Sequence, residues 1–177
     1  MGHSQLSSAL ANGHPKILSF NRAARSRCFV GMSTIEVSRE DIIKRLENTI
    51  GRDPDSVAAL YASDAVRFDP MTPEGMKGRD AVRKFHETLR RAFQFADSKT
   101  LNVLSKSDIT AWEWVLTVTH TGPFELPTGT LAPTNRQVTV KGATFYRFNR
   151  EGLIAEQRDY FDLASFMQQL GVKPGGL

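Results

Sequence analysis

The sequence predicts a single α+β domain in which a curved, mostly antiparallel sheet wraps around helices and leaves a cone-shaped pocket. Three features of the 177 residues lead to this class. Apolar residues recur at helical spacing between residues 38 and 93, then alternate with polar residues at a period of two from about residue 97. The chain then forms a β-hairpin and one short helix. Helices at the start of a chain with antiparallel strands after them are typical of this class.

Three helices are expected before the main run of strands. The first begins at Ser38, a favourable N-cap, and ends at Gly51; its apolar face is Ile42, Ile43, Leu46 and Ile50. The second begins at Asp53-Pro54, because proline is favoured in the first helical turn, and its inner face is Val57, Leu60 and Tyr61. The third covers residues 79–93, and its buried stripe is Val82, Phe85, Leu89 and Phe93.

Five strands and a last helix complete the predicted fold. A short strand at residues 65–68 ends at Asp69-Pro70 and is followed by a loop to Gly78. The longer strands are expected at residues 99–105, 109–121, 138–148 and 153–161, with a long loop at 122–135. A turn ending in Gly152 joins the last two strands into a hairpin. Asp162 and Gly171 are the expected caps of the final helix.

Composition narrows the class of protein. The chain is 40% hydrophobic, which suffices for a well-buried core, and no apolar run reaches the length of about 20 residues that spans a bilayer. Its net charge of +4 comes largely from basic residues before Met32, so we expect no basic surface for nucleic acid. The single cysteine, Cys28, excludes an intrachain disulfide and a cysteine-based zinc cluster. We therefore expect a cytoplasmic protein that binds neither nucleic acid nor membrane.

Residues 1–35 are expected to be a disordered or non-native extension, and residues 36–177 the folded domain. The extension is basic, contains few residues at regular apolar spacing and lacks acidic residues until its end. Met32 is an alternative start of the protein. A second alternative is an organelle-targeting presequence, because such segments are arginine-rich and acid-poor.

Two aspartates are the candidate catalytic residues of the pocket. Asp159 lies in the middle of the last predicted strand, where a buried carboxylate is costly unless it is paired or used. Asp69 ends the first predicted strand, although Asp-Pro is also common in ordinary turns. Two carboxylates in one apolar pocket have separated pKa values, so that one accepts a proton while the other donates a hydrogen bond.

Aromatic and hydroxyl side chains are the candidate substrate contacts. Tyr61 and Tyr146 offer phenolic donors for a developing enolate oxygen. The full predicted set is Tyr61, Trp112, Trp114, His120, Thr144, Tyr146 and Phe161. His86 is interpreted as a structural or solvated residue on a charged helix. No metal site or cofactor is expected, because the histidines lack ligand spacing and no phosphate-binding glycine loop is present.

Several motifs resemble those of the SnoaL-like polyketide cyclases, a family of the nuclear transport factor 2-like superfamily that also includes ketosteroid isomerase. The resemblance covers about residues 38–172. The matching segments are THTGPF at 119–124, PTNR at 133–136, RF with GLI and Glu156 between 147 and 156, DYFD at 159–162, and QLG at 169–171. The family implies a cystatin-like cone of curved sheet around helices.

The resemblance also implies roles for individual residues. The cyclases use a carboxylate on the last long strand for an aldol-type ring closure, and that position is Asp159. Ketosteroid isomerase-like relatives carry their base in a strand-ending Asp-Pro, which matches Asp69. The cyclases place a partner histidine on the preceding strand, and Thr144 stands there in this chain.

The resulting hypothesis is a cofactor-independent lyase or isomerase that acts on a hydrophobic cyclic or polyketide-like molecule. A non-catalytic module that binds small molecules in the same fold is the alternative, because the histidine partner is missing. Epoxide hydrolysis, as in relatives of limonene epoxide hydrolase, is a third option that requires an Asp-Arg-Asp relay. Arg158 is adjacent to Asp159 on the opposite strand face, which argues against it. The superfamily also implies a homodimer through the open sheet face, bearing either Trp112 and Trp114 or Val115.

Overall fold

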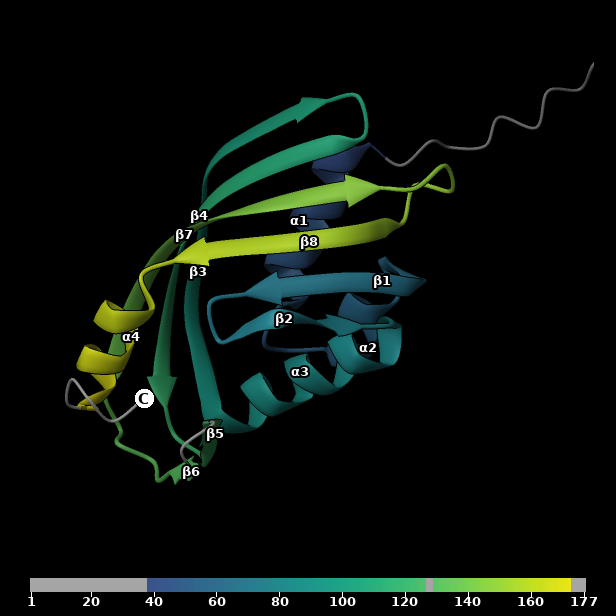
Figure 1. Cartoon of the computed structure of the whole chain (residues 1–177). Coiled ribbons are helices and arrows are strands. Elements are labelled where there is room, and N and C mark those ends of the chain that lie inside the picture. The colour runs from purple at the N-terminus through teal and green to yellow at the C-terminus, as the bar shows by residue number, and fades with distance from the viewer. Residues whose placement is uncertain (1–37, 127–128, 173–177) are drawn as a thin grey trace, which may run out of the picture. The chain divides into compact units, whose positions relative to one another are not determined.

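The computed structural model describes residues 38–126 and 129–172, which form an α+β domain with one large curved sheet (Figure 1). The predicted extension at residues 1–35 lies outside the described residues. The helices are α1 (Arg39–Thr49), α2 (Pro54–Ala58), α3 (Arg79–Ala92) and α4 (Leu163–Leu170). The strands are β1 (Tyr61–Asp69), β2 (Thr72–Lys77), β3 (Phe93–Lys106), β4 (Ile109–His120), β5 (Phe124–Leu126), β6 (Gly129–Leu131), β7 (Gln137–Phe148) and β8 (Ile154–Phe161). None of the described helices has the length and apolar character needed to cross a membrane.

The predicted helix caps are confirmed. The Ser38 hydroxyl accepts a hydrogen bond from the Asp41 backbone N–H, and the Asp162 carboxylate accepts one from the Ser165 N–H. Gly171 ends α4 in the left-handed conformation at φ 90°, a position that favours glycine. These local signals therefore specify the start of α1 and both ends of α4.

Several strand predictions need correction. Tyr61 is the first residue of β1 and not the last turn of a helix, so β1 is longer than the strand expected at residues 65–68. The segment Thr72–Lys77, expected as a loop, is strand β2, which pairs with β1. β5 and β6 form a small sheet within the expected loop at 122–135. In each case cross-strand pairing outweighs the local preference of the residues.

The large sheet has the strand order β2-β1-β8-β7-β4-β3, so the first and last long strands are neighbours. β1 and β8 run parallel, whereas the other neighbouring pairs are antiparallel. Figure 1 shows the long strands bending past α1, α2 and α3. This order brings residues about 90 positions apart in sequence side by side, which positions the site.

Two apolar clusters fill the concave side of the sheet. One joins α1 and α2 to Trp112 and Tyr146, and the other joins the end of α3 to β4, β7 and α4. The Trp112 side of β4 is therefore interior, which decides between the two strand faces that the period-two pattern left open. The face bearing Val115 is the one that remains for contact with another molecule.

Candidate functional site

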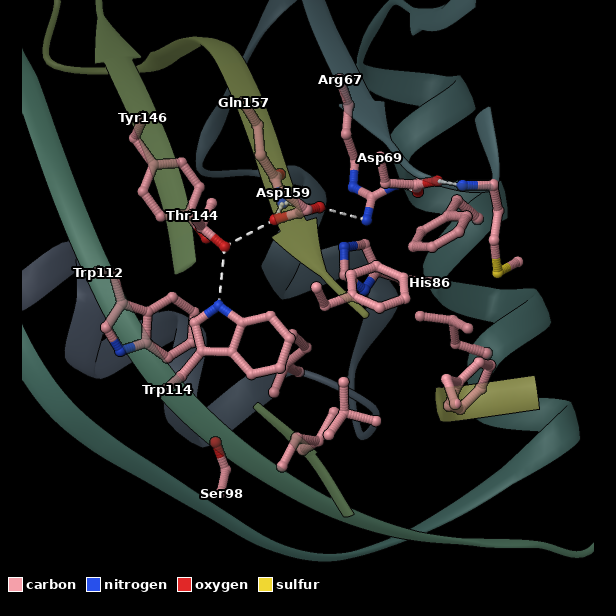
Figure 2. A pocket seen from close by; sticks show the side chains of 18 of the residues that line it. Arg67, Asp69, His86, Ser98, Trp112, Trp114, Thr144, Tyr146, Gln157 and Asp159 are labelled. Carbon is pink, nitrogen blue, oxygen red and sulfur yellow. Dashed lines mark hydrogen bonds and ion pairs between the residues drawn. The ribbon is translucent and has the colours of Figure 1, made fainter. Parts of the chain in front are cut away.

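An apolar cavity of about 130 Å³ lies between the two clusters, with walls from β1, α3, β4, β7, β8 and α4 (Figure 2). Its apolar lining includes Met71, Phe85, Leu89, Leu116, Phe124, Val140, Phe161 and Phe166. Its polar lining is gathered mainly in Arg67, Asp69, His86, Thr144, Gln157 and Asp159. A mostly apolar cavity with a few convergent polar groups is the usual form of a small-molecule site.

Arg67 lies at the centre of the polar group and forms ion pairs with Asp69 and Asp159. The Arg67 Nη2 to Asp159 Oδ2 distance is 2.6 Å, and the three side chains are only 2–6% exposed. Burial alone would lower the pKa of Arg67, but the attraction of the two carboxylates outweighs it and raises the pKa. The guanidinium carbon lies 3.8 Å from the centre of the Phe85 ring, which fixes its plane against α3.

Asp69 combines turn chemistry with an ion pair. Its Oδ1 accepts hydrogen bonds from the Met71 and Thr72 backbone N–H groups at 2.7 and 2.8 Å, while Oδ2 pairs with Arg67. Burial would raise the pKa of Asp69, but Arg67 and the two backbone donors hold it below the usual range. Both oxygens are thus occupied by donors, a geometry that suits Asp69 to positioning Arg67.

Asp159 is held by neutral side chains as well as by Arg67. Thr144 donates to Oδ1 at 2.6 Å, and the Gln157 amide lies 2.8 Å from each carboxylate oxygen. Gln157 is held in turn by the Tyr61 hydroxyl, which donates to its Oε1. Because a hydroxyl rotates, the lone pair occupied by Thr144 is the one most easily released.

Thr144 connects Asp159 to Trp114, as Figure 2 shows. The Trp114 indole N–H donates to the Thr144 hydroxyl at 2.9 Å. Gly142 is required for this contact, since an added Cβ would lie 2.6 Å from the Trp114 ring. Thr144 pairs directly with Asp159 across β7 and β8, so the residue at the expected histidine position does contact the carboxylate.

Most of the predicted site residues line the cavity. These are Asp69, Trp112, Trp114, Thr144, Tyr146, Asp159 and Phe161. Burial raises the pKa of Tyr146 well above its usual value, so its phenol stays neutral. Tyr61 does not line the cavity; it acts on the site through Gln157.

His120 was predicted to contact substrate but does not line the cavity. Its side chain is fully buried, with its ring centre 5.2 Å from that of Phe93, and its Nδ1 accepts from the Thr134 N–H at 3.2 Å. β4 turns this side chain toward the second apolar cluster and away from the cavity. The prediction for His120 therefore needs correction to a packing role.

Three of the six polar lining residues named above were not predicted: Arg67, Gln157 and His86. Arg67 and Gln157 each lie two residues before a predicted aspartate and so share its strand face, a signal present in the sequence. His86 follows Val82 by four residues and precedes Leu89 by three, which places it on the buried stripe of α3. Of the two interpretations given for His86, structural or solvated, the solvated one is wrong, since the residue is 3% exposed.

An Asp-Arg-Asp relay was disfavoured above on the position of Arg158 alone. Arg158 does point away from the cavity, where it pairs with Glu156 on the exposed face. Arg67 instead provides the link between Asp69 and Asp159. Within residues 38–126 and 129–172, no group of three or more His, Cys, Asp and Glu side chains is arranged to hold a metal ion.

The chain has a ketosteroid isomerase-like fold, and its cavity holds a buried carboxylate. The model of the SnoaL-like polyketide cyclase family matches residues 40–170. The chain belongs to this family. Comparison with curated protein sequences gave no match.

Solved structures share the fold. A candidate SnoaL-like polyketide cyclase from Jannaschia sp. CCS1 is 21% identical, with a TM-score of 0.67 over 80% of this chain and 97% of that one. AclR, a candidate hydroxylase from Streptomyces galilaeus, is 20% identical, with a TM-score of 0.64 over 77% and 82%. SalBIII, described as an epoxide hydrolase/cyclase-like enzyme in pyran ring formation in the polyether salinomycin, is 17% identical, with a TM-score of 0.58 over 72% and 92%.

Proposed function

We propose that the protein is a cofactor-independent lyase or isomerase that transfers a proton at a carbon next to a carbonyl group, on a hydrophobic cyclic or polyketide-like molecule. The observation that carries the proposal is the Asp159 carboxylate, buried in an apolar cavity and held there by Arg67, Thr144 and Gln157. A buried carboxylate held in a mostly apolar cavity is suited to act as a general base. We infer that Asp159 takes the proton.

Thr144 supports both protonation states of Asp159. It donates to the carboxylate at 2.6 Å, and its rotating hydroxyl also accepts from a protonated acid. The Trp114 indole continues to donate to the Thr144 oxygen in either state. In this arrangement Thr144 takes over the positioning part of the histidine that the sequence lacks there.

Asp69 positions Arg67, and the three charges together select the substrate. Arg67 carries one positive charge against the two negative charges of Asp69 and Asp159, so the buried group is net negative. A net negative, water-poor cavity disfavours an anionic ligand. We therefore propose a neutral, hydrophobic ketone as substrate class.

Deuterium exchange tests the proposed function without knowledge of the natural substrate. Cyclohexanone has a single ring, and a dry cavity of about 150 Å³ accommodates benzene, close to the 130 Å³ measured for this cavity. Mass spectrometry follows deuterium uptake at the carbons beside the carbonyl in D₂O. We expect the wild type to accelerate uptake over buffer and Asp159→Asn to lose about 100-fold or more of that acceleration.

Glu156→Gln is the matched control, because Glu156 lies on the same strand but on the exposed face, paired with Arg158. Its exchange rate should equal that of the wild type. An unchanged rate in Asp159→Asn would contradict the assignment of the base. Binding of cyclohexanone by wild type with no exchange above buffer would favour the non-catalytic binding module.

The Asp69–Arg67–Asp159 arrangement favours a second candidate, the opening of an epoxide ring. In such a relay one carboxylate activates the attacking water or hydroxyl, and a second, protonated carboxyl donates to the epoxide oxygen. The lowered pKa of Asp69 disfavours the protonated form that a donor needs, so this candidate ranks second. Conversion of cyclohexene oxide to its diol by wild type, in the absence of ketone exchange, would reverse that order.

A further inference from the structure

His86 is the polar residue of the cavity wall that the proposed proton transfer leaves unused. It lies on α3 and is 3% exposed, and neither ring nitrogen has a hydrogen-bond partner among the described residues. Buried polar groups without a partner are rare in folded proteins, and each calls for an explanation. Figure 2 shows the ring projecting into the cavity beside Arg67, on the side where Asp159 lies.

Several other donors around the cavity are engaged by protein groups. The Trp114 N–H is bonded to Thr144, the Tyr61 hydroxyl to Gln157, and both terminal nitrogens of Arg67 to carboxylates. Arg67 Nε is also unpaired, but it belongs to a guanidinium already held by two aspartates and Phe85. His86 therefore offers the cavity a neutral N–H that is not already committed to a protein acceptor.

The surroundings of His86 determine its chemistry. Burial, with a further contribution from the Arg67 charge, lowers the pKa of His86 to about 3. The imidazole is therefore neutral at physiological pH, with one N–H donor and one acceptor nitrogen. With that pKa it is a weak base at neutral pH, whereas a neutral imidazole N–H is an effective donor to a carbonyl oxygen.

We propose that His86 binds the carbonyl oxygen of the substrate through its ring N–H and stabilises that oxygen as it becomes an enolate. The proposal rests on the function proposed above and adds a second catalytic residue to it. When the C–H bond beside the carbonyl breaks, its proton passes to Asp159 and its electron pair forms the carbon–carbon double bond. The carbonyl π electrons move onto the oxygen, which His86 holds. In a substrate with a double bond conjugated to the enolate, return of the proton from Asp159 to the far carbon completes an isomerisation. Attack of the enolate carbon on a second carbonyl forms the new carbon–carbon bond, and the resulting alkoxide takes the proton from Asp159 to complete an aldol closure.

Two variants of His86 separate this role from a structural one. His86→Leu is an apolar replacement of a neutral buried ring, so it should fold. His86→Gln retains an N–H donor. We expect His86→Leu to lower the cyclohexanone exchange rate about 100-fold, as loss of one donor to a developing oxyanion does. His86→Gln should recover part of that loss.

The infrared carbonyl band of bound cyclohexanone gives a readout that does not depend on turnover. A hydrogen bond lowers this stretching frequency, so the band should move to higher frequency in His86→Leu and should stay near its wild-type position in His86→Gln. Measurement in the Asp159→Asn background keeps the ketone unreacted. The same band shift in that background would support binding of the carbonyl by His86. If the wild type then showed no exchange, the proposed proton transfer would be rejected.

The opposite results would overturn the role of His86. Loss of exchange in Asp159→Asn with unchanged exchange and an unchanged band in His86→Leu would keep the proposed function and reject His86. Failure of the wild type to bind the ketone would also reject it, because no carbonyl would then reach this wall of the cavity.

Discussion

Replacing Arg67 by methionine tests whether the two buried carboxylates depend on a single cation. Methionine keeps an apolar stem of similar length but leaves Asp69 and Asp159 without their ion-pair partner, and their side chains are 2% and 6% exposed. Removing one partner of a buried ion pair costs about 3–5 kcal/mol, because an uncompensated charge remains. Asp69 keeps two backbone donors, and Asp159 keeps Thr144 and Gln157, so we expect a loss within that range.

Arg158→Met is the matched control. Arg158 is one residue from Asp159 on β8, but its side chain is 45% exposed and its partner Glu156 is 33% exposed. A pair at this exposure contributes little to stability, because solvent screens its charges. Urea unfolding at pH 7 should therefore show a much larger loss of unfolding free energy for Arg67→Met than for Arg158→Met.

The pH dependence supplies the sharper part of the test. In the wild type the pKa of Asp69 is lowered from 3.8, so its contribution to stability is present at neutral pH and is lost as pH falls through its folded pKa. In Arg67→Met the Asp69 carboxylate loses its counter-charge, and burial then raises its pKa. Charged Asp69 therefore destabilises the fold at neutral pH, and protonation removes that cost.

The difference between wild type and Arg67→Met should accordingly shrink when unfolding is measured at pH 4 instead of pH 7. Equal losses for the two arginine variants would refute the reasoning. A loss of unfolding free energy in Arg67→Met that stayed constant or grew at lower pH would also refute the reasoning, because the ion pairs would then not be its cause.

Three further predictions concern β7 and the open face. Gly142→Ala should lower the free energy of unfolding in urea by about 1–3 kcal/mol, because its Cβ would lie 2.6 Å from the Trp114 ring. It should also shift the tryptophan fluorescence. An unchanged spectrum would contradict this packing argument. Thr144→Val should lower the rate of deuterium exchange into the ketone about 10-fold at similar ketone affinity, because it removes hydrogen bonds worth about 1 kcal/mol each. A changed affinity with an unchanged exchange rate would contradict a role for Thr144 in positioning the base. Phe145 and Tyr160 are 44% and 55% exposed on the outer face, so we expect a homodimer there; light scattering should detect it, with Tyr160→Lys shifted toward monomer.

Local features of the fold could be predicted because their causes lie within a few residues. A cap such as Ser38 or Asp162 bonds to the backbone three residues onward, so the residue type alone marks the helix start. The alternation in β4 likewise places Trp112 and Trp114 on one face of that strand and Val115 on the other. These signals do not depend on where the rest of the chain lies.

Strand β2 could not be predicted in this way. Pro73 and Gly75 are residues that favour loops, and Gly75 adopts φ 83°. The segment is a strand because it pairs antiparallel with β1, starting from the turn that Asp69 holds. Its structure therefore depends on pairing with β1, which cannot be predicted from the residues of the segment itself.

The charged centre of the site depends on register more than on residue type. Arg67 lies opposite Gln157 where β1 runs parallel to β8, so the side chains of Arg67 and Asp69 fall on the same face as those of Gln157 and Asp159. A shift of one residue in either strand would send one of these pairs to the opposite face. A shift of β8 would turn Arg158 toward the cavity and leave the Asp159 carboxylate without its cation, because Arg67 and Asp69 stay together on β1. Sequence patterns predict which residues of one strand lie on the same face. Which face of β1 continues into which face of β8 depends on pairing between strands about 90 residues apart. The two aspartates were therefore predictable as candidates, whereas the arginine that joins them appears only once β1 and β8 are neighbours.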